Sequence, residues 1–339
     1  FVRGLGDRYN GVQLNGMPLI SPDPLKKVIK LDIFQAELVK VLEVNKVLSA
    51  KNFADYTGAL INIETKDYPE ESFFNVSVGA KYNENATFND FYRIEADGLR
   101  YFSLDVNERK DFTPEKYLKL NRLMEINDDF KYGSFDYDIE DGLPNISAGI
   151  SGGTIKELKD NKKIGFLGSV TFDNGYSFYD DVININTNRQ NNQKARFFND
   201  QYIYNTLLAG FANLTYLNGS KSKIKYNFMF LNNGEDDFKL KSGKDEDWGE
   251  GNYLTRVAIY SNYRLINNQL NGEYSLKEDI SDITWNLGLA NAFYSVPDRR
   301  EIVFRVDETP RSFLTLNNGN DTKRIVVDQN TNTLTGGIN

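Results

Sequence analysis

Apolar and polar residues alternate with a period of two over much of the chain after residue 70. The even positions from Phe74 to Tyr82 are apolar, and the odd positions between them are polar or small. Such alternation predicts a β-strand with one apolar and one polar face. The same pattern recurs at Ile164 to Phe172, Ile224 to Phe230, Leu270 to Leu276 and Ile283 to Leu289.

The length of these segments suits strands that cross a membrane. A tilted transmembrane strand takes about ten residues, with its apolar face toward lipid and its other face toward water. We therefore predict strands at 71–83, 146–157, 163–175, 203–217, 222–234, 252–276 and 283–296, with one more near Arg324 to Asp328.

The predicted connections alternate between short and long. Residues 159–162, 218–222 and 277–282 are short links, whereas 174–202 and 232–252 are long and polar. Short turns at one rim and long loops at the other are typical of outer-membrane barrels. A soluble β-sandwich or jelly roll could share the alternation but has less reason to sort its loops by length. The predicted fold class is an all-β transmembrane barrel.

Two loop features carry their own predictions. Residues 84–145 form the first large loop, in which Thr113 and Pro114 open a short helix that ends near 121. The acidic run 235–237 falls in a later long loop. Because it lacks the spacing of a calcium-binding loop, we predict that it is solvated surface.

The N-terminal region has a different pattern. Asn15-Gly16 can take the positive φ angles of a two-residue hairpin turn. Residues 41–44 and 61–63 are predicted to be two short buried strands, and Gly58 would permit close backbone approach between them. On these residues alone, a pair of core strands in a small α/β domain remains an alternative.

Composition excludes several classes of protein. No stretch approaches the roughly 18 apolar residues of a membrane-spanning helix. Cysteine and histidine are both absent, which removes disulfides, thiolate nucleophiles, histidine triads and imidazole metal sites. The net charge of -8 argues against nucleic-acid binding, which needs a basic surface. We predict no enzyme activity, no catalytic residue, no cofactor and no metal site.

The N-terminal motifs together resemble the plug of a TonB-dependent outer-membrane receptor. They are the segment from Phe1 to Asn10, the turn at 14–16, and Gly58-Ala59-Leu60-Ile61-Asn62-Ile63-Glu64-Thr65-Lys66. The family pattern has an Arg-Gly entry, an Asn-Gly turn, a Val-Glu-Val strand and an Ile-Asn-Ile exit into the barrel. The resemblance implies plug-motif positions at Arg3, Gly4, Asn15, Gly16, Glu43, Lys46, Gly58 and Asn62.

The same resemblance implies how the plug is held. Basic plug residues in this family pair with carboxylates of the barrel wall, and Arg3 and Lys46 take these places here. Family members often have arginine at the second place, and lysine makes a weaker, unforked contact with a carboxylate. The alternative is that both residues are ordinary solvated charges.

The resemblance also extends into the later part of the chain. Segments 256–260, 269–274 and 297–301 are similar to a run in receptors of the Bacteroidota. It implies the C-terminal part of a partial α/β plug domain at 1–68 and the first seven or eight barrel strands at 69–339. Since a plugged transporter barrel has about 22 strands, we expect an internal fragment of a longer protein.

The implied function is TonB-dependent import across the outer membrane of a Gram-negative bacterium, without catalysis. The partners implied are TonB, outer-membrane lipid and a scarce or large ligand, most simply a ferric siderophore. An oligosaccharide or peptide importer, which can require a surface lipoprotein, is an alternative. A small passive barrel or adhesin, and a soluble β-rich binding protein, are rivals from other classes.

Overall fold

The structure is a computed structural model of the chain. It describes residues 9–24, 33–47, 56–94, 102–103, 137–191, 193–277, 281–306, 312–314 and 323–339. These residues form strands and their connections, with one short 3-10 helix at Glu246–Trp248 and no α-helix among them. Within these ranges, no helix has the length and apolar character to cross a membrane.

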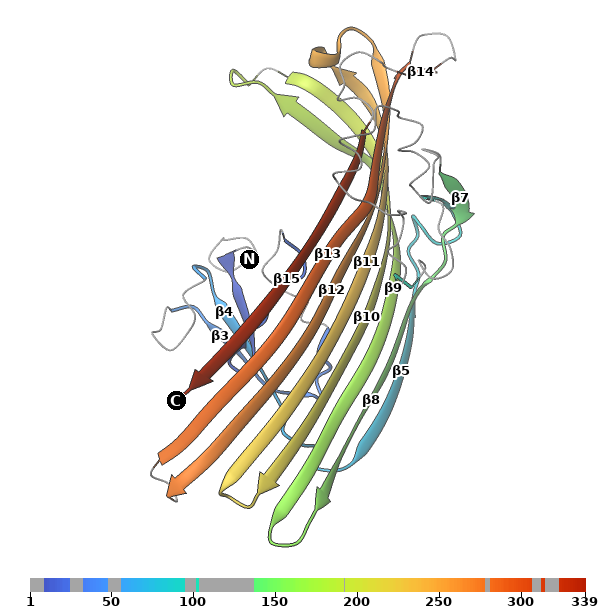
Figure 1. Cartoon of the computed structure of the whole chain (residues 1–339). Helices are drawn as coiled ribbons and strands as arrows, with labels where there is room; N and C mark the ends of the chain where they lie inside the picture. The colour runs from blue at the N-terminus through green and yellow to red at the C-terminus, as the bar shows by residue number, and fades with distance from the viewer. Residues whose placement is uncertain are drawn as a thin grey trace, which may run out of the picture.

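Nine strands form one large, curved sheet (Figure 1). Every neighbouring pair in it is antiparallel. β5 lies at one edge, the order then runs from β8 to β13, and both β14 and β15 pair with β13. The strands are β5 (Phe73–Lys81), β8 (Asn145–Glu157), β9 (Lys162–Thr187), β10 (Gln193–Asn218), β11 (Ser222–Asp245), β12 (Asn252–Lys277), β13 (Ser281–Val306), β14 (Ser312–Leu314) and β15 (Lys323–Ile338).

The large antiparallel sheet confirms the all-β class and the predicted strands, but the predicted long loops are wrong. β9 and β10 continue through most of 174–202, and β11 runs on to Asp245. The alternation persists there, since aromatic side chains such as Tyr176, Tyr202 and Phe238 still recur on one face. Polar residues between them do not interrupt a strand whose backbone remains paired on both sides. The strand predicted near 324–328 extends to Ile338.

A second, small sheet lies on the concave side of the large one (Figure 1). Its order is β2 (Met17–Pro18), β1 (Gly11–Leu14), β4 (Leu60–Thr65) and β3 (Val39–Asn45). β1 and β4 run parallel, and the other pairs are antiparallel. We call this the small sheet, and we call the face of the large sheet that it covers the inner face.

The small sheet confirms one prediction and corrects another. Asn15 and Gly16 have φ angles of 51° and 78° and form the predicted tight turn between β1 and β2. β3 does pair with β4, but β3 is exposed over most of its length rather than buried. β3 is an edge strand of the small sheet, whereas β4 has a neighbour on each side.

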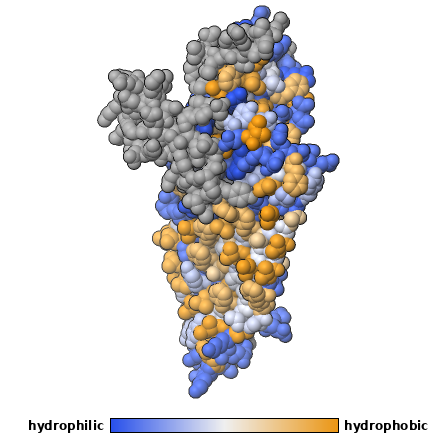
Figure 2. All heavy atoms as spheres, turned by 90° about the vertical axis from the view of Figure 1, so that its right-hand side faces the viewer, coloured by the Kyte–Doolittle hydropathy of each residue, from blue (hydrophilic) through white to orange (hydrophobic). Residues whose placement is uncertain are grey.

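The opposite, outer face of the large sheet carries a band of exposed apolar side chains. Figure 2, which shows the convex side, has an apolar zone between hydrophilic ends. This apolar band is made of outward residues in β5, β8, β9, β10 and β13, including Phe74, Val76, Val78, Ile150, Phe166, Val170, Leu214, Leu287 and Leu289. Cross-strand pairing joins them laterally, as in the row of Val76, Ile150 and Val170.

A third element covers another part of the outer face. β6 (Asp90–Arg93) and β7 (Asp138–Asp141) pair as a two-stranded sheet on the convex side (Figure 1). Phe91 and Tyr92 of β6, and Tyr137 just before β7, pack in one cluster with Tyr176, Tyr202, Tyr204 and Phe238 of the large sheet. The predicted loop 84–145 therefore contains a paired hairpin. The helix predicted at 114–121 lies outside the described residues.

The acidic run 235–237 is also not the solvated surface that we predicted. Asp236 and Asp237 are both buried, on opposite faces of β11. Asp236 accepts a hydrogen bond from Arg93 of β6, and Asp237 accepts one of 2.8 Å from Gln201. Each carboxylate has a partner on its own side of the strand, which is why burial is tolerated.

Candidate functional site: the contact between the small sheet and the large sheet

An apolar core joins the small sheet to the inner face. Leu14 and Ile63 of the small sheet are buried in one cluster with Met229 and Leu265 of the large sheet. The same cluster contains Val12, Leu19, Ile33, Leu38, Leu167, Ala209, Phe211, Leu231, Ala290 and Ala292. The small residues Ala209, Ala290 and Ala292 let the two sheets approach closely. Burial of this surface is the main attraction between the sheets.

A chain of polar side chains lies beside this core. Asn15 Oδ1 is 2.9 Å from the backbone nitrogen of Thr65, and the Thr65 hydroxyl is 3.3 Å from Asn227 Oδ1 in β11. Asn227 Oδ1 accepts a further hydrogen bond of 2.8 Å from Asn213 of β10. The inner face is therefore polar where it meets the end of β4. Each buried amide here has a partner, which limits the cost of burial.

One charged contact fastens the end of the small sheet to the large sheet. The Lys225 Nζ group donates to Asp67 Oδ1 at 2.9 Å and to the Thr65 carbonyl at 2.5 Å. Lys223 Nζ lies 3.3 Å from Asp67 Oδ2 and 2.9 Å from Glu273 Oε2. Asp67 lies two residues after the end of β4, so these bonds hold the segment that connects the small sheet to β5.

Burial decides the strength of this contact. The Lys225 side chain is only 7% exposed and that of Asp67 is 26% exposed. Burial opposes ionisation of Asp67, but the Lys225 and Lys223 ammonium groups outweigh it, so that the pKa of Asp67 is lowered. At neutral pH the carboxylate is charged and accepts hydrogen bonds from both lysines.

The charges are opposite to those that the family resemblance implies. The resemblance puts basic residues on the plug and carboxylates on the barrel, whereas here the carboxylate belongs to the connecting segment and the lysines to β11. Lys46 is exposed and makes no ion pair within the described part of the chain. Arg3 and Gly4 lie outside the described residues. Sequence reasoning missed Asp67, although Lys223 and Lys225 on the polar face of one predicted strand were a usable signal.

Four of the other predicted positions come together. Asn15, Gly16, Glu43 and Asn62 line one polar cavity of about 510 Å³ between the two sheets, together with Lys223, Lys225, Glu273 and residues near the end of β15. The Asn62 side chain accepts a 3.0 Å hydrogen bond from the Gly16 backbone and so fixes the turn.

Gly58 has a role other than the predicted one. A Cβ atom at this position would lie 2.3 Å from Asn10 Oδ1. That oxygen accepts a 3.0 Å hydrogen bond from the Ala59 backbone nitrogen. Gly58 therefore allows close approach of the segment before β1, and not of β3 to β4.

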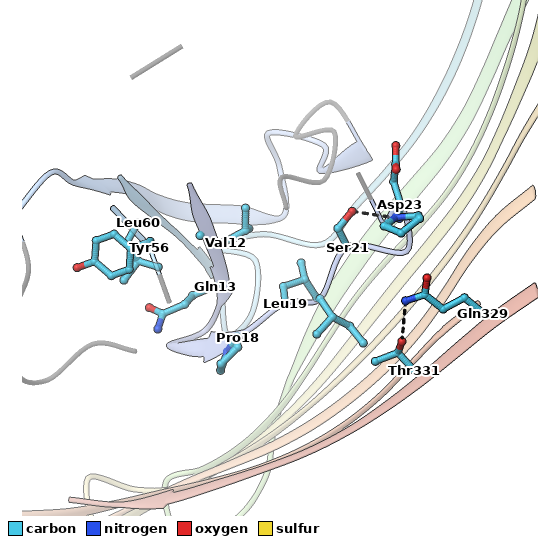
Figure 3. Close-up of a pocket in the computed structure, with 13 residues that line it drawn as sticks. Val12, Gln13, Pro18, Leu19, Ser21, Asp23, Tyr56, Leu60, Gln329 and Thr331 are labelled. Atoms are coloured by element: carbon cyan, nitrogen blue, oxygen red, sulfur yellow. Dashed lines mark hydrogen bonds between the residues drawn. The ribbon is translucent and has the colours of Figure 1, made fainter. Parts of the chain in front are cut away.

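A second cavity, of about 300 Å³, lies on another side of the small sheet. In Figure 3 its lining runs from Val12 and Leu60 through the loop around Leu19 and Asp23 to Gln329 and Thr331 of β15. The apolar residues come from the small sheet, whereas the large sheet contributes amide and hydroxyl groups. The contact between the sheets therefore leaves polar space on two sides instead of forming one sealed core.

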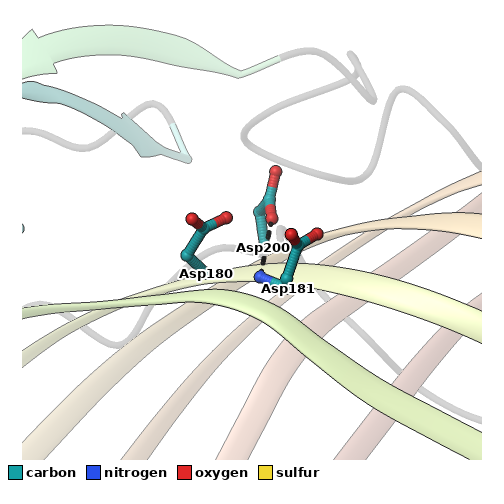
Figure 4. A group of neighbouring side chains, drawn as sticks. All are labelled: Asp180, Asp181 and Asp200. Carbon is teal, nitrogen blue, oxygen red and sulfur yellow. Dashed lines mark hydrogen bonds between the residues drawn. The ribbon is translucent and has the colours of Figure 1, made fainter.

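A group of three carboxylates lies away from this contact. Asp180, Asp181 and Asp200 place one oxygen each within 4.8 Å of the others (Figure 4). Partial burial and the neighbouring Asp180 raise the pKa of Asp200. The Asp181 backbone donates to Asp200 at 3.3 Å. The group is mostly exposed, and we assign no cation to it.

Comparison of the chain with protein-family models, with curated proteins and with solved structures gave no match.

Proposed function

We propose that this chain is part of a TonB-dependent outer-membrane receptor, in which the small sheet belongs to the plug and the large sheet to the barrel wall. The observation that carries the proposal is the arrangement of the two faces of the large sheet. Its outer face bears the exposed apolar band, and its inner face combines an apolar core with buried polar groups and holds a separate small sheet. A lipid-facing outer surface and a polar, plugged interior are features of transporter barrels.

The backbone supports the same proposal. A membrane-spanning strand must have its peptide groups paired, because unpaired groups in hydrocarbon cost several kcal/mol each. β9 to β12 are each paired on both sides over most of their length. Within the described part of the sheet, β5 forms one open edge, and β14 and β15 form the other. In a barrel these edges pair with further strands, which agrees with a wall of about 22 strands.

The proposed activity is uptake of a scarce or large ligand, with a ferric siderophore as the first candidate. The small sheet obstructs the inner face, so transport requires it to move or rearrange. TonB supplies this displacement by a pull on the plug. The contact between Asp67 and the two lysines resists detachment at the connecting segment, and the polar cavities beside it provide space that water can enter.

Uptake measurements in the bacterium that encodes this chain test the proposal. The gene is deleted and complemented, and entry of radiolabelled ferric siderophores is compared with and without a proton uncoupler. We expect uptake to be lost on deletion, restored on complementation and abolished by the uncoupler. Energy-independent uptake would instead indicate a passive barrel. Unchanged iron uptake combined with loss of energy-dependent oligosaccharide uptake would change the ligand class but leave the receptor assignment intact.

A further inference from the structure

The part of the outer face above the apolar band is covered by protein. On β9, Val170 is 55% exposed, whereas Tyr176, on the same face, is 1% exposed. On β10, likewise, the Leu214 side chain is exposed and the Tyr204 side chain is buried. Among the residues that the structure describes, the cover consists of 83–94, 102–103 and 137–142, which we call the outer layer. The exposed apolar band therefore ends where the outer layer begins.

The surface beneath the outer layer differs chemically from the band. Thr206, Asn232 and Asp236 are buried on the outer face of β10 and β11. Ser103 is in contact with Thr206, and its carbonyl accepts a 2.9 Å hydrogen bond from Asn232. Polar groups of this kind are unfavourable against hydrocarbon. This part of the sheet therefore belongs above the lipid core.

The outer layer is held rigidly to the large sheet. Arg93 forms an ion pair of 3.3 Å with Asp236 and one of 3.1 Å with Glu140. Its guanidinium carbon lies 4.2 Å from the centroid of the Tyr204 ring. Phe91 packs edge-on against Tyr176, with ring centroids 5.0 Å apart. The buried ion pair to Asp236 and the packing of the guanidinium on the Tyr204 ring together hold β6 and β7 in one position.

A tight turn in this layer presents an aromatic side chain to the outside. Residues 83–89 are closed by hydrogen bonds from Thr87 and Asn85 to Asn83. The turn is tied to the hairpin because the Phe88 backbone donates to Gly142 at 2.7 Å. Phe88 has a φ angle of 62° and its side chain is 68% exposed. A rigid turn thus holds a large apolar ring away from the protein.

The place of this turn in the chain indicates what the ring contacts. The outward stripe of β5, which includes Val76 and Val78, continues into the exposed Tyr82, and the turn follows at once. Exposed Trp, Phe and Leu side chains of a membrane-surface element bury into the boundary between headgroups and acyl chains. Phe102, also exposed and packed on Phe172 of β9, lies in the same layer.

We propose that the outer layer rests on the surface of the outer leaflet and that Phe88 inserts into the lipid interface as an anchor. Lipid is the partner that the exposed Phe88 ring contacts, and the outer layer sets the depth of the large sheet in the membrane. This inference rests on the proposed membrane location. It adds a lipid-binding role to a hairpin that sequence analysis treated as loop.

Fluorescence quenching in vesicles tests the anchor, with single cysteines introduced into these 339 residues, which contain none, and any native cysteine elsewhere in the full-length protein replaced by serine. The full-length protein is reconstituted in phosphatidylcholine vesicles, whose zwitterionic surface neither attracts nor repels Glu84, Asp90 and Asp180 near Phe88, so that quenching at 88 reports insertion of the apolar side chain. Phe88→Cys, Val78→Cys and Arg189→Cys each receive an environment-sensitive fluorophore. Lipids with a nitroxide at the headgroup or midway along the acyl chain serve as quenchers.

We expect the label at 88 to lose most fluorescence with the headgroup nitroxide, the label at 78 with the acyl-chain nitroxide, and the label at 189 with neither. Quenching at 78 but not at 88 would overturn the anchor and leave the membrane location standing. No quenching at 78 would overturn both. If Phe88→Cys does not fold, Phe102→Cys is labelled instead. We expect the label at 102 to be quenched by the headgroup nitroxide. No quenching at 102 would contradict contact between the outer layer and the membrane.

Discussion

Lys225 Nζ lies 2.9 Å from Asp67 Oδ1, although the two residues are 158 positions apart in the chain. The lysine projects from the inner face of β11, and the aspartate belongs to the segment that leaves the small sheet. This bond, with the second one from Lys225 to the Thr65 carbonyl, ties the small sheet to the large sheet at the point where the chain passes between them. The first predictions concern this contact.

Replacement of Asp67 by asparagine is expected to weaken attachment of the small sheet. It leaves Lys225 buried without a carboxylate, at a cost of about 1–3 kcal/mol for a partly buried pair. A cysteine placed at the buried Val12 reports detachment through its rate of reaction with maleimide, which should rise in Asp67→Asn. Asp160→Asn, in an exposed turn, is the matched control and should not change the rate. Equal rates in all three backgrounds would contradict the prediction.

Removal of both charges is expected to be milder than removal of one. In the double variant Asp67→Asn and Lys225→Met no unpaired buried ammonium remains, so the labelling rate at residue 12 should return toward that of the parent. A buried ion pair replaced on both sides is often close to neutral. A double variant that detaches faster than Asp67→Asn would show that Lys225 contributes through contacts other than Asp67.

The lowered pKa of Asp67 gives the contact a pH dependence. Because the folded-state pKa lies below the ordinary value of 3.8, the contact contributes its full stability above that value and loses it as pH falls through the lowered pKa. Thermal unfolding of parent and Asp67→Asn should therefore differ at neutral pH and converge in acid. A difference in unfolding temperature that grows as pH falls would have the wrong sign.

Arg93 is expected to hold the outer layer in place. Arg93→Met removes the ion pair between Arg93 and the buried Asp236, and loss of one member of a buried pair typically costs about 3–5 kcal/mol, so β6 and β7 should become open to proteases. Arg93→Lys keeps the charge but loses the forked donor, so an intermediate effect is expected. Limited proteolysis followed by mass mapping of cuts at 84–94 and 137–142 measures this. Arg189→Met, at an exposed turn, should match the parent.

Sequence analysis predicted the fold class well because strand alternation is a local property. The alternation of apolar and polar residues from Ile224 to Phe230 predicted the two faces of β11, and the Asn15-Gly16 pair predicted the tight turn that these residues form. The reach of β9 to β11 beyond the expected ends was missed because polar residues there were interpreted as loop. Asp236 is the clearest case, since its burial depends on Arg93, which is 143 positions away.

The candidate site was less predictable for the same reason. The polar cavity gathers Asn15, Glu43 and Asn62, as the motif suggested, but the charged contact joins Asp67 to lysines of β11. Pairing of this kind depends on how two sheets pack, and no local pattern specifies it. The role of Gly58 likewise required knowledge of where Asn10 lies.

The Gly58 contact leads to a further prediction. Gly58→Ala places a methyl group against the Asn10 amide, which must move and lose its bond to Ala59. A loss of about 1–3 kcal/mol is expected from an overpacked site and a broken buried hydrogen bond. Gly210→Ala is the matched control, since its Cβ would have no neighbour closer than 3.9 Å. In calorimetric unfolding, Gly58→Ala should unfold at a lower temperature than Gly210→Ala. Equal stability of the two variants would contradict the close approach of Asn10 to Gly58.

The central claim is that the outer face of the large sheet meets lipid and the inner face does not. A nitroxide scan along β10, from residue 207 to residue 216, tests it most directly in the full-length protein in bilayers. We expect oxygen accessibility to peak at the even positions, including Leu214, and a water-soluble nickel chelate to be excluded from them. Equal accessibility along the strand, or access of the nickel chelate to the even positions, would contradict the membrane-wall assignment.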